Sequence, residues 1–499
     1  MNRQLNRLAV AALVLLVALI VGTTYWQTWA AAGLKDRQDN AVERVAQFKI
    51  DRGRIYASDG KTTLATSFPK KVKTQTFYFR RYPSHGLAAQ TVGYSTVARS
   101  QAGLEKSEND FLTASNANLS SVFDSTLAKF SGATVRGNNL VLTLDARAQR
   151  VALQQLGNRC GAVVALEPAT GKVLVLASSP TYDPNLVEKK NGFAKILHIR
   201  GSCGGESALL NRATDGLFTP GSTFKLVTVS AALDTGKFTP DSQFYDPGYC
   251  VEYGKHVSNA GAPDSPGAET FGNVTLSQGL IHSINSVFCN VGKQLGARVI
   301  LNYAQRYGVY ATPPLETPAN ERTPSGLYNG THLFDPKDQN LVDPGRLAFG
   351  QERMLVSPLQ MAMIAGAIAN GGRVMRPYVV DRVTAHGGVT ISRTKPDVLG
   401  RAIKPQTAQE ITQMMLGAVQ SGTGTAAQIS GVQVAGKTGT AESAVAHVNT
   451  TWFVCFAPAN APRFVVAVVL EKQHGFGGQF SAPVAKQVLQ TLLRSHHGP

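Results

Sequence analysis

Four short Ser-x-x-Lys patterns in this 499-residue chain could each supply a nucleophilic serine and a lysine base. The two side chains can act together only if they lie one helical turn apart on the same face. Three of the patterns run through turn residues or end against a proline, those of Ser58, Ser67 and Ser392. Only Ser222 and Lys225 follow helix-start residues (219–221) and lead into an apolar run (226–233). We therefore predict Ser222 at the N-terminal end of a buried helix, where backbone N–H groups favour negative charge.

Two further polar patterns follow Ser222. Ser283-Ile284-Asn285 opens another apolar helical segment, and Lys437-Thr438-Gly439-Thr440 occurs once. Taken singly, each has an ordinary explanation, since polar residues cap helices and lysines lie in solvated turns. A second Ser-x-Asn, Ser107 with Asn109, precedes Ser222 among acidic residues, and we set it aside. The ordered triple Ser-x-x-Lys, Ser-x-Asn and Lys-Thr-Gly indicates serine acyl-transfer chemistry much more strongly than any one motif.

The segments around these motifs predict an α+β fold. Strands are expected at 140–145, 161–166, 172–177, 451–456 and 463–470, and helices at 148–156 and 483–493. Because strands stand at both ends of a largely helical region, we expect one antiparallel sheet assembled from distant segments, with helices packed against it. Before it, residues 35–138 suit a smaller α+β module that starts with a charged, helix-like stretch at 35–44.

The N-terminus carries an uncharged run of 27 residues, Leu8–Leu34, after Arg3 and Arg7. Such a run is long enough to span a bilayer as a helix, and the two arginines favour a cytoplasmic N-terminus. Aromatic residues expected at the outer interface are Tyr25, Trp26 and Trp29. A cleaved signal peptide is the alternative, because Ala30–Ala32 offers small residues to a peptidase. Either way the catalytic region would be exported, which excludes nucleic acid as a partner.

The net charge and the cysteine content limit which partners and metal sites are possible. The net charge of +17 suits an anionic partner without identifying one. None of the five cysteines has C-x-x-C or metal-ligand spacing, so a zinc site is not indicated; they are Cys160, Cys203, Cys250, Cys289 and Cys455. An oxidising compartment permits one or two bridges, whose pairing stays open, and the odd count leaves at least one free thiol. Cys455 is predicted to be a core thiol on a strand.

The three motifs resemble those of penicillin-recognising serine transferases and hydrolases, and most closely those of class B penicillin-binding proteins of the actinobacterial penicillin-binding protein A type. Other stretches similar to that family cover most of the chain: Arg52–Ala57, Val92–Tyr94, Gly103–Glu105, Leu142–Asp145, Ala165–Gly171, Ser178–Asn185, Asn211–Thr214, Gly350–Gln351, Ser357–Gln360 and Gly422–Ala426. Together they make the resemblance specific.

The resemblance implies a domain plan. Residues 1–34 would be a cytoplasmic stub and transmembrane anchor, 35–138 a pedestal or dimerisation-like module, 139–494 the transpeptidase domain, and 495–499 a tail. The transpeptidase domain would have the penicillin-binding fold, an antiparallel sheet with helices on both faces plus an all-helical subdomain. Neither a metal nor an organic cofactor is implied.

The resemblance also implies the chemistry. The chain would be a D,D-transpeptidase that cross-links peptidoglycan stem peptides through an acyl-enzyme on Ser222. Lys225, partly neutralised beside Lys437, would be the base. Ser283 would relay a proton to the departing D-Ala, and Asn285 would hold Lys225 and the substrate amide.

The Lys-Thr-Gly segment would bind the substrate. Lys437, Thr438 and Thr440 would hold the terminal carboxylate. Gly439 would let the peptide approach an edge strand as an added strand. The backbone N–H groups of Ser222 and Thr440 would form the oxyanion hole.

Several other functions are consistent with part of this pattern of motifs. A D,D-carboxypeptidase or a serine β-lactamase carries the same triple, and a non-enzymatic β-lactam sensor or scaffold is the alternative of another class. A bifunctional protein would need a glycosyltransferase domain, for which the residues before 138 are too few. The expected partners are stem peptides, β-lactam antibiotics, the plasma membrane and proteins of cell division or elongation. The catalytic domain is expected outside the plasma membrane on a single-pass anchor.

Overall fold

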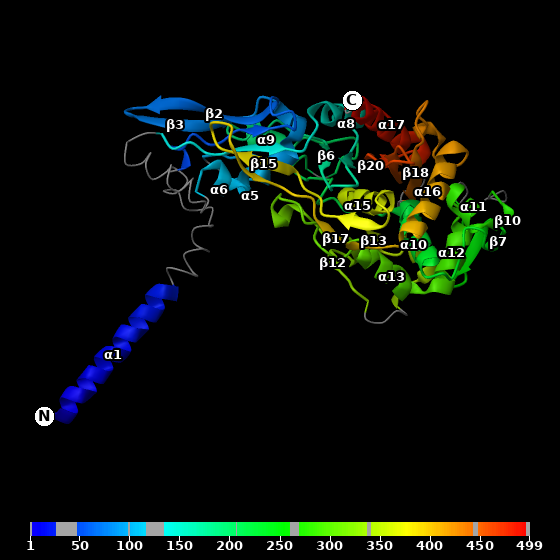
Figure 1. Ribbon diagram of the computed structural model, residues 1–499, viewed down its shortest axis with the longest axis horizontal. Coiled ribbons are helices and arrows are strands. Elements are labelled where there is room, and N and C mark those ends of the chain that lie inside the picture. The colour runs from blue at the N-terminus through cyan, green and yellow to red at the C-terminus, as the bar shows by residue number, and fades with distance from the viewer. Residues whose placement is uncertain are drawn as a thin grey trace.

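The computed structural model describes residues 2–25, 47–97, 100–115, 134–205, 207–259, 269–336, 341–442 and 448–495. Two larger sheets and a mainly helical lobe make up most of the described chain (Figure 1). The predicted stretch at 35–44 lies outside the described residues, as do Trp26, Trp29 and Ala30–Ala32.

The N-terminal run begins as a helix, α1 (Asn2–Thr24). Among the residues that the structure describes, no helix combines the length and the apolar character needed to cross a membrane. The predicted transmembrane helix is therefore not confirmed.

A five-stranded antiparallel sheet forms the centre of the catalytic region, with the strand order β18-β19-β20-β5-β6. Its strands are β5 (Gly161–Leu166), β6 (Val173–Ser179), β18 (Ala435–Glu442), β19 (Asn449–Ala457) and β20 (Phe464–Gln473). The first two strands come from the start of the region and the other three from its end. The predicted sheet assembled from distant segments is thus confirmed, and β18 lies at its edge.

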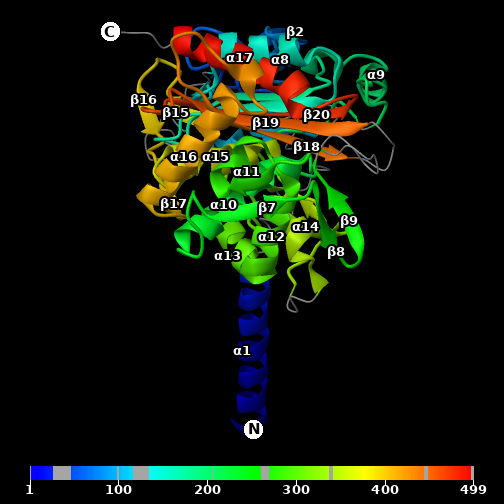
Figure 2. The same cartoon turned by 90° about the vertical axis from the view of Figure 1, so that its right-hand side faces the viewer.

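Helices cover both faces of this sheet, as predicted (Figure 2). One face packs against α8 (Ala146–Leu156) and α17 (Gly477–Ser495), and the other against α15 (Pro358–Ala369). Alternate residues of β19 serve the two faces: Phe453 and Cys455 lie in the α17 cluster, and Trp452 in the other. The closing helix was predicted to start at Pro483, but it begins earlier, at Gly477. Pro483 lies in its second turn, where it removes one backbone donor without ending the helix.

The helical lobe surrounds α10 (Lys225–Asp234). Its other helices are α11 (Leu276–Ile281), α12 (Asn285–Leu295), α13 (Ala297–Arg306), α14 (Pro344–Ala348) and α16 (Pro405–Gln420). The expectation of an all-helical subdomain is wrong, because small sheets are inserted between these helices. They are formed by β7 (Gln243–Asp246) with β10 (Gly272–Thr275), by β8 (Tyr249–Glu252) with β9 (Lys255–Ser258), and by β11 (Gly326–Asn329) with β12 (His332–Leu333) and β13 (Met354–Leu355).

Two disulfides and one free thiol account for the five cysteines. Cys160 pairs with Cys203, and Cys250 pairs with Cys289, which ties the β8–β9 hairpin to α12. Cys455 is a free, fully buried thiol on β19, as predicted.

The N-terminal module shares its sheet with the catalytic region. The strand order is β16-β15-β4-β1-β2-β3, with β1 (Ile55–Tyr56), β2 (Thr63–Val72), β3 (Gln75–Arg81), β4 (Asn139–Leu142), β15 (Val380–Thr384) and β16 (Thr390–Arg393). The central strand β4 is parallel to β1 and antiparallel to β15. The predicted boundary between residues 138 and 139 therefore falls at a sheet to which both segments contribute.

A buried ionic cluster holds the N-terminal module together. The Glu105 carboxylate accepts from Arg52 Nε and from Arg80 Nε, each at 2.7 Å, and its side chain is 0% exposed. Burial alone would raise the pKa of Glu105, but Arg80 and Arg52 together lower it below the ordinary value. Arg52 also donates to Asn109 Oδ1 at 2.6 Å, so the second Ser-x-Asn pattern serves this cluster.

We predict that Glu105→Ala lowers the free energy of unfolding by about 3–5 kcal/mol, because it leaves two buried guanidinium groups without their anion. Chemical denaturation of the purified protein measures this. Glu352→Ala is the matched control: Glu352 pairs with the exposed Arg353 at 2.9 Å, and its loss should cost no more than about 1 kcal/mol. Equal losses for the two variants would contradict the assignment.

Candidate active site

Ser222 lies in a 3-10 turn, η4 (Gly221–Phe224), that leads directly into α10. The serine is thus at the N-terminal end of a buried helix, as predicted, although its own turn is the tighter 3-10 form. Gly221 has a φ of +51°, and a Cβ there would come within 2.5 Å of Thr440 O. Only glycine allows this turn to contact β18, and the contact brings Ser222 beside Thr440.

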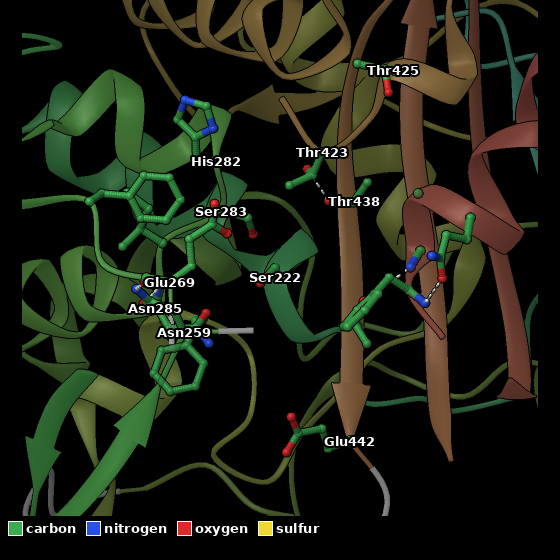
Figure 3. Close-up of a pocket in the computed structure, with 18 of the residues that line it drawn as sticks. Ser222, Asn259, Glu269, His282, Ser283, Asn285, Thr423, Thr425, Thr438 and Glu442 are labelled. Atoms are coloured by element: carbon green, nitrogen blue, oxygen red, sulfur yellow. Dashed lines mark hydrogen bonds between the residues drawn. The ribbon is translucent and has the colours of Figure 1, made fainter. Parts of the chain in front are cut away.

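Ser222 is half-buried and opens onto a cavity of about 630 Å³. Figure 3 shows Ser222 between Ser283 and Asn285 on one side and Thr438 of β18 on the other. The predicted residues among its lining are Ser222, Ser283, Asn285, Thr438 and Thr440. Lys225 and Lys437 are 0% exposed and lie behind this surface.

Lys225 is held by acceptors from the Ser-x-Asn segment. Its Nζ donates to Ser283 O and to Asn285 Oδ1, both at 2.7 Å, and lies 3.3 Å from Ser283 Oγ. The Phe288 ring of α12 lies beneath it, with 5.2 Å from Nζ to the ring centroid. A neutral amine has two N–H donors and one lone pair. The two short contacts would use both donors, which leaves the lone pair free for an O–H group.

Burial drives both lysines toward their neutral forms. The pKa of Lys225 is lowered well below its ordinary value, first by burial and then by the nearby charge of Lys437. Burial also lowers the pKa of Lys437, to about 7. Within the described residues, neither lysine forms an ion pair with a carboxylate. At neutral pH the site can therefore provide an uncharged amine.

Ser283 connects the two lysines. Its Oγ accepts from Lys437 Nζ at 2.8 Å, and Lys437 also donates to Thr438 O at 3.0 Å. The Ser283 backbone has a φ of +62°, a left-handed conformation that costs a non-glycine residue roughly 1–2 kcal/mol. That conformation turns both the carbonyl and the hydroxyl of Ser283 to Lys225.

Lys437 does not line the cavity, so the structure gives no direct path from its ammonium to a substrate carboxylate. Thr438 and Thr440, from the same segment as Lys437, do line the cavity. Thr438 Oγ1 lies 2.6 Å from Thr423 Oγ1, and Thr440 Oγ1 accepts from Gly477 N at 3.2 Å. The carboxylate contact of Lys437 stays a prediction, and the contact that the structure shows for its Nζ is the one with Ser283.

Gly439 lies where β18 packs against the Ser222 turn. A Cβ at this position would lie 2.8 Å from Pro220 O and 2.8 Å from Thr223 Cγ2. Both atoms belong to the Ser222 turn or its approach, so the glycine permits β18 to pack closely against Ser222. Its role in admitting a peptide strand stays a prediction.

Several cavity residues were not assigned from the sequence. Thr423 and Thr425 belong to the Gly422–Ala426 stretch, which contributed to the family resemblance without suggesting a role for either residue. Asn259, His282 and two exposed carboxylates, Glu269 and Glu442, had no recognisable spacing. Figure 3 shows Glu442 at the C-terminal end of β18, below Ser222 in this view.

Two groups of side chains bring cysteine sulfurs near a carboxylate, at Glu471 and at Glu252. Their cysteines form the two disulfides, so these sulfurs are not thiolate ligands.

Comparison with known proteins identifies the family. Residues 161–490 match the penicillin binding protein transpeptidase domain, and residues 52–140 match the penicillin binding protein A dimerisation domain. The chain belongs to the class B penicillin-binding proteins.

Relatives resemble this penicillin-binding protein along its whole length. It is 33% identical to peptidoglycan D,D-transpeptidase PbpA of Mycolicibacterium smegmatis and 33% identical to that of Mycobacterium tuberculosis, with 99% of each chain covered in both cases. It also resembles the solved structure of penicillin-binding protein A from M. tuberculosis in a ceftriaxone acyl-enzyme complex. That match has a TM-score of 0.78 and 31% identity, and covers 90% of this chain and 100% of the other.

The lowered pKa of Lys225 predicts the pH dependence of acylation. If the neutral Lys225 amine is the active form, a lysine with an ordinary pKa would make the rate rise about tenfold per pH unit up to pH 10. Because the pKa of Lys225 lies well below 10.5, we expect the rise to level off well below pH 10. Stopped-flow labelling of this penicillin-binding protein with a fluorescent penicillin measures the rate, with circular dichroism as the folding control. A tenfold rise per unit that continues to pH 10 would contradict a lowered pKa of Lys225.

Proposed function

We propose that this class B penicillin-binding protein is a peptidoglycan D,D-transpeptidase whose nucleophile is Ser222. The observation that carries the proposal is the network around Ser222: Ser283 and Asn285 line the same cavity, and they bind the buried lysines Lys225 and Lys437 behind it. Relatives that match along the whole chain are named as D,D-transpeptidases. Without a neutral base beside it, the Ser222 hydroxyl would be a poor nucleophile.

The first half-reaction acylates Ser222. Its Oγ attacks the carbonyl carbon of the D-Ala–D-Ala peptide bond while its proton passes to Lys225 Nζ. The C–N bond then breaks, and the departing amine takes a proton from Ser283 Oγ, which is replenished by Lys225. The backbone N–H groups of Ser222 and Thr440 would stabilise the oxyanion, each by on the order of 3 kcal/mol.

The second half-reaction returns the enzyme. The amine of a second stem peptide attacks the ester carbonyl, its proton leaves along the same Ser283–Lys225 route, and Ser222 Oγ recovers its hydrogen. A β-lactam would enter by the first half-reaction, because its amide carbonyl occupies the same position. Its amine stays tethered to the acyl group and obstructs the second nucleophile.

Substrate binding follows from the edge position of β18. The terminal carboxylate would be bound by the hydroxyls of Thr438 and Thr440, while the charge of Lys437 acts from behind Ser283. Asn285, which holds Lys225 through its Oδ1, would also contact the substrate amide. The donor peptide would extend along β18, whose outer edge has no partner strand among the described residues.

We also propose that residues 8–34 anchor the protein in the plasma membrane with the catalytic domain outside. The apolar side chains of α1 support this, since Leu13, Leu15 and Leu19 are 63%, 71% and 65% exposed. The two disulfides suit an exported domain. Proteins of cell division or elongation would dock on the N-terminal module, which carries none of the catalytic motifs.

N-terminal sequencing of the membrane-extracted protein tests the anchor. We expect the mature chain to keep residues 1–10. A mature N-terminus near Gly33 would show that the segment is a cleaved signal peptide.

Mass spectrometry after exposure to benzylpenicillin tests the nucleophile. We expect one penicilloyl adduct, mapped to Ser222, that Ser222→Ala abolishes. Ser58→Ala, Ser67→Ala and Ser392→Ala are matched controls, because these serines belong to the other Ser-x-x-Lys patterns and should leave labelling intact. Labelling that survives Ser222→Ala would refute the assignment.

The lifetime of the adduct separates the transpeptidase from a hydrolase with the same motifs. Rapid hydrolysis needs a base that holds a water against the ester, and each extra 1.4 kcal/mol of barrier lengthens the lifetime about tenfold. We expect the adduct to persist for many minutes. Turnover at several per second would indicate a β-lactamase, and release of D-Ala without cross-linking would indicate a carboxypeptidase.

A further inference from the structure

The helix that carries Asn285 has no cap of its own. α12 begins at Asn285, and its N-cap residue, Ile284, offers no side-chain acceptor. The first backbone N–H groups of a helix need acceptors from elsewhere. Here one side chain provides them: Asn259 Oδ1 accepts from Asn285 N at 3.0 Å and from Ser286 N at 3.1 Å. The start of the catalytic helix is therefore fixed by a residue from a different segment.

Asp246 and the backbone carbonyl of Glu269, which accepts from Asn259 Nδ2 at 3.1 Å, together determine which way the Asn259 amide points. Both carboxylate oxygens of Asp246 accept from Asn259 Nδ2, at 3.1 and 2.9 Å. A carboxylate only accepts, so the NH₂ group of Asn259 must face Asp246, and its carbonyl oxygen must face α12. Asp246 is 0% exposed and Asn259 is 6% exposed, so water does not compete for these contacts.

The same carboxylate ties down the surroundings of the cavity. Asp246 also accepts from Gly248 N at 2.8 Å, from Phe271 N at 3.0 Å and from the Ser286 hydroxyl. Within the described part of the chain, its hydrogen-bond partners are all neutral donors. Phe271 lines the cavity and stacks on His282, with 5.2 Å between the ring centroids, immediately before Ser283. His282 and Ser286 flank the Ser-x-Asn motif. The buried carboxylate of Asp246 thus binds Ser286 directly and reaches His282 through Phe271.

The network ends at the proposed base. Asn285 has its backbone N–H bound by Asn259 and its side-chain NH₂ donated to Ser258 O at 3.0 Å, so its Oδ1 is left pointing at Lys225 Nζ. An acceptor in the wrong place would let the Lys225 amine turn away from Ser222.

We propose that Asp246 and Asn259 are positioning residues for acylation: Asp246 orients Asn259, which caps α12 from outside and so places Asn285 against Lys225. The inference rests on the proposed roles of Asn285 and Lys225. Neither Asp246 nor Asn259 touches the reacting atoms. Asp246 is fully buried, and Asn259, which lines the cavity, has its amide engaged by Asp246, by Glu269 O and by α12, so their effect should appear in the acylation step and not in penicillin affinity.

An exchange of the two side chains tests the pair. Asp246→Asn puts two amides face to face, and Asn259→Asp puts two carboxylates face to face, so either change alone should turn the cap away from α12. When both substitutions are present, the carboxylate at position 259 can accept from α12 and from the amide at position 246. Stopped-flow labelling of the full-length protein with a fluorescent penicillin gives the first-order acylation constant and the non-covalent dissociation constant separately.

We expect each single variant to lower the first-order constant by between about tenfold and a hundredfold, with the dissociation constant unchanged. The double variant should recover part of the loss, since the amide at position 246 can no longer accept from both Gly248 N and Phe271 N. Asp145→Ala is the control, since Asp145 caps α8 by accepting from Arg147 N and Ala148 N, and α8 packs on the sheet face opposite α15. It should lower the melting temperature without changing the acylation constant.

A purely structural role would reduce the folded fraction but leave the constant per labelled molecule unchanged. Single variants that acylate at the wild-type constant would overturn the proposal, as would a double variant no faster than the single ones. If Asp246→Asn does not fold, Asn259→Ser, which removes the amide and keeps Asp246, carries the same expectation. Failure of the proposed function itself would be visible separately, because the wild-type protein would not be labelled at Ser222.

Discussion

Two lysine side chains share one serine hydroxyl in the interior of this protein, and the active site depends on that contact. Ser283 Oγ lies 3.3 Å from Lys225 Nζ and 2.8 Å from Lys437 Nζ, and both lysines are 0% exposed. Two buried ammonium groups cannot both keep their charge cheaply without a carboxylate nearby. Burial of the two lysines costs folding free energy, but it favours an uncharged amine next to Ser222.

Bringing those groups together requires close contact between segments that are far apart in the chain. The Ser222 turn, the β18 strand and the N-terminus of α17 meet where Gly221, Gly439 and Gly477 lie. A Cβ at Gly221 would come within 2.5 Å of Thr440 O, and one at Gly477 within 2.4 Å of Gly439 O. The Ser222 turn and β18 are thus held at backbone contact distance, which fixes the position of the cavity relative to the buried lysines.

Much of this arrangement could be predicted from local patterns. The strands at 161–166 and 463–470 are apolar runs long enough to identify, and Ser222 could be chosen because a helix pattern follows it. The resemblance of the motifs to a known family supplied the roles. What local patterns could not provide was contact between distant segments: the depth of Lys437 behind Ser283, the packing reason for Gly439, and the partnership of Asp246 with Asn259. Those depend on which segments the fold brings together, and no spacing in the chain encodes them.

The charge state of Lys225 is the central claim, and side-chain NMR of lysine-labelled protein measures it directly. The ¹³Cε and ¹⁵Nζ shifts, assigned with Lys225→Arg and Lys437→Arg, report the titration of each amine in the unacylated enzyme. We predict that Lys225 titrates well below the ordinary lysine pKa and that Lys437 titrates near pH 7. A Lys225 signal that remains that of an ammonium up to pH 10 would contradict the account.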